Sequence, residues 1–458
     1  MVASGCDWRD SLLAIVCSVM PAGYPLVRPY KMLDFANNQS IDSDFVFSRS
    51  TTATFVNASG VLTTAGVDTL RPSYDPYTGQ YLGVLFEYGS TNLLPWSNNI
   101  AHPSWYYAPQ NAPLQSGFIG VGNQPTAFRV GEGIIPGSWE LATSIALGSG
   151  STTAVSAFVK SDGVSKGFLQ FLGVNNSGVI VGNLATFFDL SRGEIYPENY
   201  GTNALAAKME RRINGWFRAG MIGNIPSTAT LGVLLLKLQN DDNSLFYLGR
   251  GRGLLVDGFQ VERDVSSPKA SAISSFIFTS GVALTRATDQ LRSDGARLGQ
   301  WYVQSSGTFY QEAITNEADW FGEGRGYLLA TNTNTGARAE LRYGMPGPKI
   351  IGVVGSGSSV DYTASYVGGG NGLNPWELPA SGTGTSRPIY GHSAFVFSNS
   401  GLNVFYNGQA VASNALGLVP SGVNRVDISP QAGGVFTLRR CAFYPPLSTE
   451  QASLITQT

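Results

Sequence analysis

The chain of 458 residues is longer than one ordinary core, only 13% of its residues are charged, and it contains 56 glycines. Its length predicts two or three domains, and its composition favours short strands joined by tight turns over amphipathic helices. A net charge of -2 argues against nucleic acid and anionic lipid as partners, since both need clustered Lys and Arg. Three scattered cysteines predict neither a disulfide framework nor a zinc site.

Residues 1–45 predict an anchor helix followed by an extended arm. The apolar stretch 11–20 is too short to span a membrane, and acidic residues precede it where a signal peptide carries basic ones. We therefore expect a short docking helix, capped by Asp7 or Ser11, and no membrane insertion. Prolines and asparagines without periodicity over residues 24–44 predict an arm whose backbone pairs with another segment.

Residues 46–97 predict a small β connector. Apolar and polar residues alternate over residues 44–66 and the pattern turns at Asn-Ala-Ser-Gly, where Gly60 supplies a positive φ. The stretch 71–89 repeats this alternation around a second turn. Two hairpins are expected in this segment.

Two longer series of strand patterns follow, separated by turn clusters, and they predict an all-β fold with two tandem β-sandwiches. The first series covers residues 98–283 and the second covers 301–458, with a polar linker at 284–300. Asn407-Gly408 predicts a tight hairpin in the second series. Near the end of the chain, Ser448 precedes Gln451 by three residues, which is a capping box that opens one short helix.

No arrangement in the sequence predicts catalysis. The chain has two histidines, His102 and His392, and neither lies in the context of a catalytic triad. Glycosidic cleavage needs two carboxylates at a set separation. The nearest pair, Glu312 and Glu317, falls on opposite faces of a strand. The other candidate acids are Glu87, Glu262 and Asp319.

We expect neither an enzyme nor a cofactor. Residues 240–243, Asn-Asp-Asp-Asn, could offer oxygen ligands to Ca²⁺, but the spacing of an EF-hand is absent and polar turns of this composition are common. No metal ligand is therefore assigned.

Aromatic side chains in loops are the better candidates for a binding site. Flat apolar rings with a polar rim bind sugars by stacking, so we select Trp105, Tyr106 and Tyr107, together with Trp376, as carbohydrate-binding residues. Two other tryptophans, Trp216 and Trp301, lie in strand patterns and are expected in the core.

Glu87 stands inside an apolar run, Leu82 to Phe86, that fits a strand buried on both faces. A buried carboxylate is costly unless it is paired. With no second acid at a useful spacing, Glu87 is predicted to be a structural acceptor for backbone amides or for an arginine such as Arg49 or Arg71.

The stretches "FSRSTTATFVNASGVLTTA" and "RPSYDPYTGQYLGVLFEYGSTNLLPWS" resemble a segment of tailed-bacteriophage virion proteins of the head-spike and tail-fibre group. Downstream, "VSAFVKSDG", "RINGWFRAG" and "VDGFQVER" look like the carbohydrate-binding-module jelly roll that follows it. "SGTFYQEAIT" and "LRRCAFYPPLSTEQASLIT" resemble a concanavalin/laminin-G-like sandwich.

The resemblance implies a protein of the virion surface that displays sugar-binding sandwiches to a host-cell glycan. It also implies a homo-oligomer. Adhesion through weak sugar contacts needs several copies, so we expect a symmetric oligomer, most simply a trimer. The first 40 residues have no match, and we expect them to attach the chain to a capsid or tail protein. The docking residues would be Trp8, Leu12, Leu13, Ile15 and Val16.

Two alternatives remain open at this point. One is a capsid decoration or cement protein whose sandwiches bind no sugar. The other is a depolymerase that cuts surface polysaccharide. A glycan array separates the first from an adhesin, and the release of reducing ends identifies the second.

Overall fold

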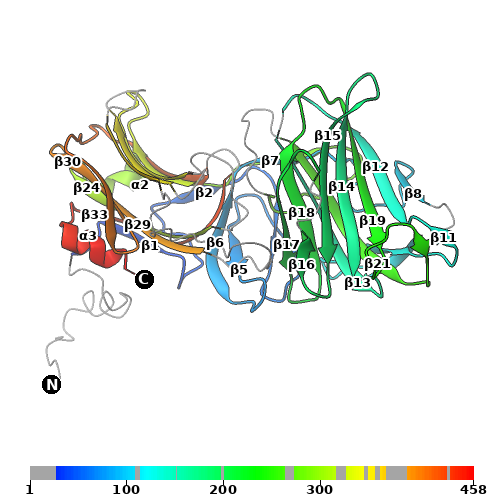
Figure 1. Ribbon diagram of the computed structural model, residues 1–458. Coiled ribbons are helices and arrows are strands. Elements are labelled where there is room, and N and C mark those ends of the chain that lie inside the picture. Colours follow the sequence, from blue (N-terminus) through cyan, green and yellow to red (C-terminus); the bar gives the residue numbers. More distant parts are fainter. Residues whose placement is uncertain are drawn as a thin grey trace.

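The computed structural model confirms an all-β fold with two β-sandwiches, which lie side by side (Figure 1). Two short helices are described, α2 (Gly295–Gly299) and α3 (Thr449–Ile455). The structure describes residues 27–108, 114–150, 152–196, 201–263, 273–315, 326–344, 349–355, 362–367, 389–430 and 434–457.

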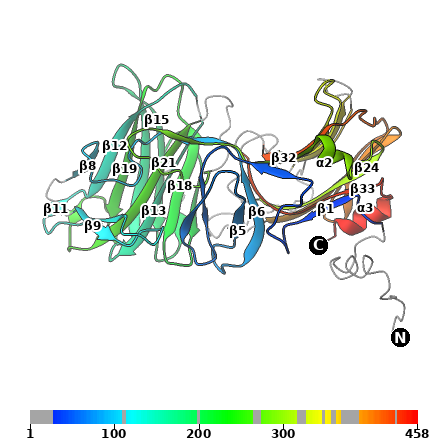
Figure 2. The ribbon, with the colours of Figure 1, turned by 180° about the vertical axis from the view of Figure 1, so that it is seen from behind.

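The first sandwich consists of two antiparallel sheets that enclose one apolar core. One sheet has the order β17 (Ala204–Arg211), β18 (Phe217–Asn224), β13 (Thr152–Asp162), β21 (Gly253–Arg263), β10 (Ala127–Gly131) and β9 (Leu114–Phe118). The other has the order β16 (Glu194–Tyr196), β15 (Ile180–Asp189), β14 (Lys166–Val174), β19 (Leu231–Gln239), β12 (Glu140–Ala146) and β8 (Trp105–Ala108). A ribbon of β11 (Pro136–Gly137) and β20 (Tyr247–Leu248) lies at the end far from the second sandwich (Figures 1 and 2).

The second sandwich has its own core between two further antiparallel sheets. One has the order β31 (Gln409–Asn414), β30 (Gly401–Tyr406), β29 (Ile389–Ser398), β24 (Gly307–Thr315), β33 (Val435–Tyr444), β6 (Tyr81–Glu87) and β5 (Arg71–Tyr74), and β1 (Lys31–Asp34) also pairs with β33. The other has the order β2 (Val46–Ser48), β23 (Gln290–Asp294), β32 (Arg425–Pro430), β25 (Gly326–Thr331), β26 (Arg338–Gly344), β27 (Lys349–Gly355) and β28 (Tyr362–Val367).

The boundaries predicted for the connector and the linker are wrong. Within residues 46–97, β6 pairs with β33 and buries Phe86 against Phe436, with ring centroids 5.3 Å apart. Within the predicted linker 284–300, β23 pairs with both β2 and β32 and buries Leu291 in the second core. β6 and β23 are therefore strands of the second sandwich, and local alternation could not show this because it does not identify a strand's partner.

The arm after residue 27 pairs with β33, as its lack of periodicity predicted. β1 and β6 lie end to end along one edge of β33, since Asp34 faces Arg440 and Val84 faces Leu438 in the register. The other edge of β33 pairs with β24. β33 thus pairs with two strands from the beginning of the chain, β1 and β6, and with β24 from its final third.

The first sandwich is inserted into the second. The chain leaves the second sandwich through β7 (Ser90–Asn92) and returns through β22 (Leu284–Arg286), and these two strands pair with each other. The hydroxyl groups of Thr91 and Thr285 are 2.7 Å apart across this pair. Residues 93–283 therefore form a unit whose entry and exit are adjacent.

A hairpin of β3 (Ala53–Val56) and β4 (Leu62–Ala65) connects the two sandwiches. Leu62 packs with Val121 and Trp216 of the first sandwich in a small apolar cluster. Its turn contains Gly60, at a φ of 76°, and a Cβ there would come within 2.5 Å of Ile213. The turn thus requires glycine both for its backbone and for close approach to the neighbouring sandwich.

The predicted docking helix, with Trp8, Leu12, Leu13, Ile15 and Val16, lies outside the described residues. Within the described ranges, no helix has the length and apolar character needed to cross a membrane.

Candidate functional site

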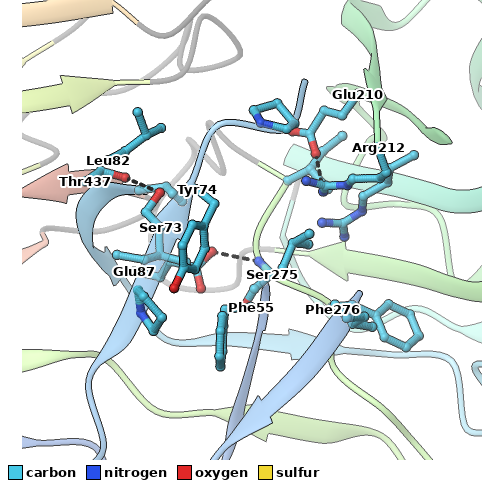
Figure 3. A pocket seen from close by; sticks show the side chains of 18 of the residues that line it. Phe55, Ser73, Tyr74, Leu82, Glu87, Glu210, Arg212, Ser275, Phe276 and Thr437 are labelled. Atoms are coloured by element: carbon cyan, nitrogen blue, oxygen red, sulfur yellow. Dashed lines mark hydrogen bonds and ion pairs between the residues drawn. The ribbon is translucent and has the colours of Figure 1, made fainter. Parts of the chain in front are cut away.

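A cleft with a cavity volume of about 130 Å³ lies where the β3–β4 hairpin, β5 and β6 face the first sandwich. A single water needs only about 10–15 Å³, so the cleft holds more than one solvent molecule. Figure 3 shows Tyr74 and Glu87 on one side and Glu210 and Arg212 on the other. Its lining includes Phe55, Tyr74, Tyr77, Glu87, Phe158, Lys208, Glu210, Arg212, Arg218, Ser275 and Phe276.

Glu87, at the end of β6, is only 2% exposed, and three groups bind its carboxylate. Arg71 from the neighbouring strand β5 pairs directly with it. A nitrogen of Arg286 lies 3.6 Å from Oε2, and the backbone N–H of Ser275 donates to Oε1 at 2.7 Å. The arginine partner and the backbone donor predicted for Glu87 are thus both present.

These contacts keep Glu87 ionised. Burial alone raises the pKa of the carboxyl, but Arg286, Arg71 and the hydrogen bond from Ser275 outweigh it and lower the pKa to about 2. A general acid near neutral pH needs a raised pKa. Glu87 therefore has the electrostatics of a structural anion.

Arg49, the other predicted partner of Glu87, instead binds Asp289, with its Nη1 2.9 Å from Oδ1. Arg71 bridges Asp289 and Glu87 through its two terminal nitrogens. The backbone N–H of Glu87 also donates to Asp289, at 2.8 Å. We call Arg49, Arg71, Glu87, Arg286 and Asp289 the junction cluster, and all five side chains are buried.

The opposite wall of the cleft carries Glu210 on β17, with a cation on each side. Lys208 pairs with Oε1, and Nη2 of Arg212 lies 2.7 Å from Oε2. Burial raises the pKa of the Glu210 carboxyl, but Lys208 and Arg212 outweigh it and hold that pKa well below its usual range. Glu210 is ionised at neutral pH, like Glu87, so neither carboxylate facing the cleft is set up to donate a proton.

Arg218 on β18 lies deeper in this wall and hydrogen-bonds to uncharged oxygens. It donates to the hydroxyl of Ser156 at 3.0 Å and to the carbonyl of Ser274 at 2.7 Å. Its guanidinium lies 5.3 Å from the centroid of Phe158, a cation–π contact that fixes its plane. The positive charge of Arg218 is thus held in place without an ion pair in the described part of the chain.

Aromatic rings complete the cleft on the side of the connector. Phe55 of the hairpin and Tyr74 and Tyr77 of the β5–β6 hairpin are all partly exposed and line it. Tyr74 packs edge to face on Tyr81 with centroids 5.7 Å apart. Half-buried rings beside charged side chains have the composition of a site for a ligand that is both apolar and polar, such as a sugar.

The aromatic residues predicted from the sequence are divided by the structure. Trp105 is 6% exposed, packs on Phe259 and donates its indole N–H to the carbonyl of Trp96 at 3.0 Å, so its selection as a sugar-binding residue is wrong. The segment is the edge strand β8, which alternates: Tyr106 is 52% exposed, and Tyr107 packs partly against the core. Trp376 lies outside the described residues. Trp216 and Trp301 are buried, as predicted.

The other candidate groups have structural partners. His102 stacks on Trp96, and His392 lies 3.0 Å from the hydroxyl of Tyr310. Glu312 binds Arg440 at 2.7 Å and also Arg439. These contacts hold each group within the fold.

The polar turn at 240–243 is closed by its own hydrogen bonds, with Asp242 accepting from the backbone of Ser244 at 2.9 Å. Glu262 accepts from Ser90 and Ser274. Within the described ranges, no three His, Cys, Asp or Glu side chains come together to hold a metal ion. Glu317 and Asp319 lie outside those ranges.

The charged wall of the cleft was not predicted from the sequence. Every second residue from 208 to 212 is charged: Lys208, Glu210 and Arg212. This spacing places them on one face of a strand, a pattern that is also typical of an ordinary solvent-exposed strand. That spacing was the available signal. What the sequence could not show is that the connector places aromatic rings opposite this face.

Comparison with known proteins gives only distant likenesses. No family model and no curated protein matches the chain. The carbohydrate-binding module CBM40 of the Ruminococcus gnavus IT-sialidase, bound to α2,6-sialyllactose, is 14% identical with a TM-score of 0.26, covering 34% of this chain and 84% of that chain. A leech intramolecular trans-sialidase has the same identity and TM-score, covering 35% of this chain and 24% of that chain.

Mouse laminin α1 chain domains LG4-5 are 10% identical with a TM-score of 0.18, covering 75% of this chain and 95% of that chain. The three proteins are named as a carbohydrate-binding module, a trans-sialidase and a pair of laminin G domains. Likenesses at these TM-scores assign no function to this chain.

Proposed function

We propose that the protein is a component of a tailed-bacteriophage virion, a head spike, head fibre or tail fibre, that binds host-surface glycans without cleaving them. The observation that carries the proposal is the cleft between the two sandwiches, where Tyr74 and Phe55 face Lys208 and Arg212. Rings stack on the apolar faces of a sugar, and charged groups at the rim hydrogen-bond its hydroxyls.

The phage assignment is supported by the segment 46–97, whose sequence resembles that group of virion proteins. Its residues Arg49, Arg71 and Glu87 belong to the junction cluster, and Asn92 donates to the carbonyls of Phe259 and Ile277 in the first sandwich. A segment that joins the two sandwiches through buried contacts suits a protein that presents them at a particle surface.

A non-catalytic role is supported by the ionisation of the cleft's carboxylates. Glu87 and Glu210 are each bound to two cations, and both have lowered pKa values. A glycosidase needs one protonated carboxyl group beside an ionised one. Single sugar contacts are weak, so adhesion would depend on several copies per virion, and we propose a trimer attached through the N-terminal segment.

The test is an array of bacterial surface glycans probed with the purified full chain, beside the variants Tyr74→Ala and Tyr106→Ala. We expect binding to at least one glycan, a loss of several-fold to about tenfold in Tyr74→Ala, and little change in Tyr106→Ala. A loss confined to Tyr106→Ala would move the site to strand β8 and refute the role of the cleft. No binding, with normal incorporation into virions, would favour a decoration protein.

Two further measurements complete the test. Release of reducing ends from host polysaccharide would identify a depolymerase instead. Mass photometry is expected to find a trimer, and a purely monomeric chain would contradict the avidity argument.

A further inference from the structure

The charged groups that line the cleft do not balance. Three of them are cations, Lys208, Arg212 and Arg218, and two are carboxylates, Glu87 and Glu210. Glu87 is already neutralised from behind by Arg71 and Arg286, which belong to the junction cluster. The three cations of the opposite wall face Glu210 and, outside the lining, Glu262, which interacts with Arg218. These groups together carry one more positive than negative charge, so this wall of the cleft is positive.

Arg212 has an unused donor at this point. One terminal nitrogen binds Glu210 at 2.7 Å, whereas Nε is buried and has no hydrogen-bond partner among the described residues. The side chain is only 11% exposed, so water has little access to it. Guanidinium groups often bind carboxylates and phosphates through two parallel N–H donors. An oxygen of a ligand in the cleft could accept a hydrogen bond from the unpaired Nε.

The surroundings favour a sugar over a bare anion. Phe55 and Tyr74 face this wall across the cleft, and they offer apolar surface that an inorganic ion cannot use. Arg218 adds positive potential to this wall, because its hydrogen bonds to described residues go to Ser156 and Ser274 and not to a carboxylate. A ligand that fits both the aromatic wall and the cationic wall has a ring with a negatively charged group on one of its edges.

We propose that the cleft binds an acidic sugar, a pyranose bearing a carboxylate or phosphate group, with Arg212 and Lys208 contacting the anionic group and Tyr74 the ring. This inference rests on the glycan-binding function proposed for the same site. It goes further in naming the chemical class of the ligand and the residues that select it.

The test uses matched sugars that differ in the anionic group alone: methyl glucuronide against methyl glucoside, and glucose 6-phosphate against glucose. Binding to the full chain is measured by saturation-transfer NMR and calorimetry, at low salt and at 0.5 M NaCl. We expect an acidic sugar to bind about tenfold or more tightly than its neutral partner, and the difference to shrink in high salt. The two pairs also distinguish carboxylate from phosphate as the preferred group.

The variants Arg212→Gln and Lys208→Gln are expected to lose most of this preference while neutral sugars bind as before. Lys237→Gln is the matched control, because Lys237 also pairs with a glutamate across strands of the same sandwich, Glu140 at 2.8 Å, but does not line the cleft. Thermal melting checks that each variant folds. If Arg212→Gln does not fold, Lys208→Gln still tests the inference.

Three outcomes would overturn the inference. Equal binding of acidic and neutral sugars refutes selection by charge and leaves the glycan-binding function standing. Inorganic phosphate that binds as tightly as glucose 6-phosphate refutes recognition of the ring. Absence of binding by every sugar, on the glycan array as well, refutes the proposed function itself.

Discussion

The substitution Glu87→Gln removes the charge at the centre of the junction cluster while keeping the shape of the side chain. It leaves Arg71 and Arg286 buried with Asp289 as their only carboxylate in the cluster. Breaking a buried ion pair by removing one partner costs about 3–5 kcal/mol, because the other charge stays desolvated and unpaired. We expect a loss of this size in the free energy of unfolding.

The pH dependence gives a second estimate of the same quantity. The pKa of Glu87 falls from 4.5 to about 2 on folding, and a shift of this size is worth about 3 kcal/mol. Since the folded pKa is the lower one, the stabilisation is present in full above pH 4.5 and is lost as pH falls toward 2. The glutamine variant cannot titrate here, so the gap between the two proteins should close over that pH range.

The assay is urea denaturation of both proteins from pH 7 down to pH 2, followed by tryptophan fluorescence. Asp162→Asn serves as the control, because Asp162 pairs with Arg129 at the surface with its side chain 45% exposed. An exposed pair contributes at most about 1 kcal/mol. The reasoning is refuted if Glu87→Gln costs no more than Asp162→Asn, or if the gap between wild type and Glu87→Gln stays constant with pH.

Three further substitutions test how the sandwiches are held together. Asn92→Ala leaves the buried backbone groups that the amide binds without a partner, and it should lower the free energy of unfolding in urea by about 2–4 kcal/mol. A loss under 1 kcal/mol would contradict the role given to this amide. Gly60→Ala should lower the melting temperature more than Gly178→Ala. Both residues have a φ of 76°, but only at Gly60 would the added Cβ contact another residue. Equal losses would show that backbone strain alone matters. Ser448→Ala removes the cap of α3 and should cost about 1 kcal/mol, with Ser448→Asp restoring it; an unchanged melting curve for both would argue against the cap.

Local features were predictable from the sequence wherever they depend on neighbours in the chain. The hairpin at Asn407-Gly408 has positive φ at both residues, 43° and 84°. The capping box of Ser448 and Gln451 is complete, with both reciprocal hydrogen bonds. Turn geometry and helix capping involve a few consecutive residues, so the pattern contains the whole interaction.

The pairing of distant strands was not predictable, because alternation looks the same in a free connector and in a strand at the middle of a sheet. The same limit affected the site. Trp105 is next to the exposed Tyr106, and only the register of β8 against β12 decides which of the two rings faces the core. The two walls of the cleft come from segments far apart in the chain, so the sequence of one wall could not show that the other faces it.

The nested arrangement has a consequence for the order in which the protein is made. Residues 93–283 contain every strand of the inserted sandwich, so this unit can fold while the rest of the chain is still being synthesised. The enclosing sandwich must wait for β33, whose Arg440 reaches Asp34 across 406 positions of sequence. Such distant pairing is slow, and until it forms β6 and β24 expose unpaired edges. We therefore expect the nascent chain to pass through a stage with one finished sandwich and one open sheet, when it is most prone to aggregation.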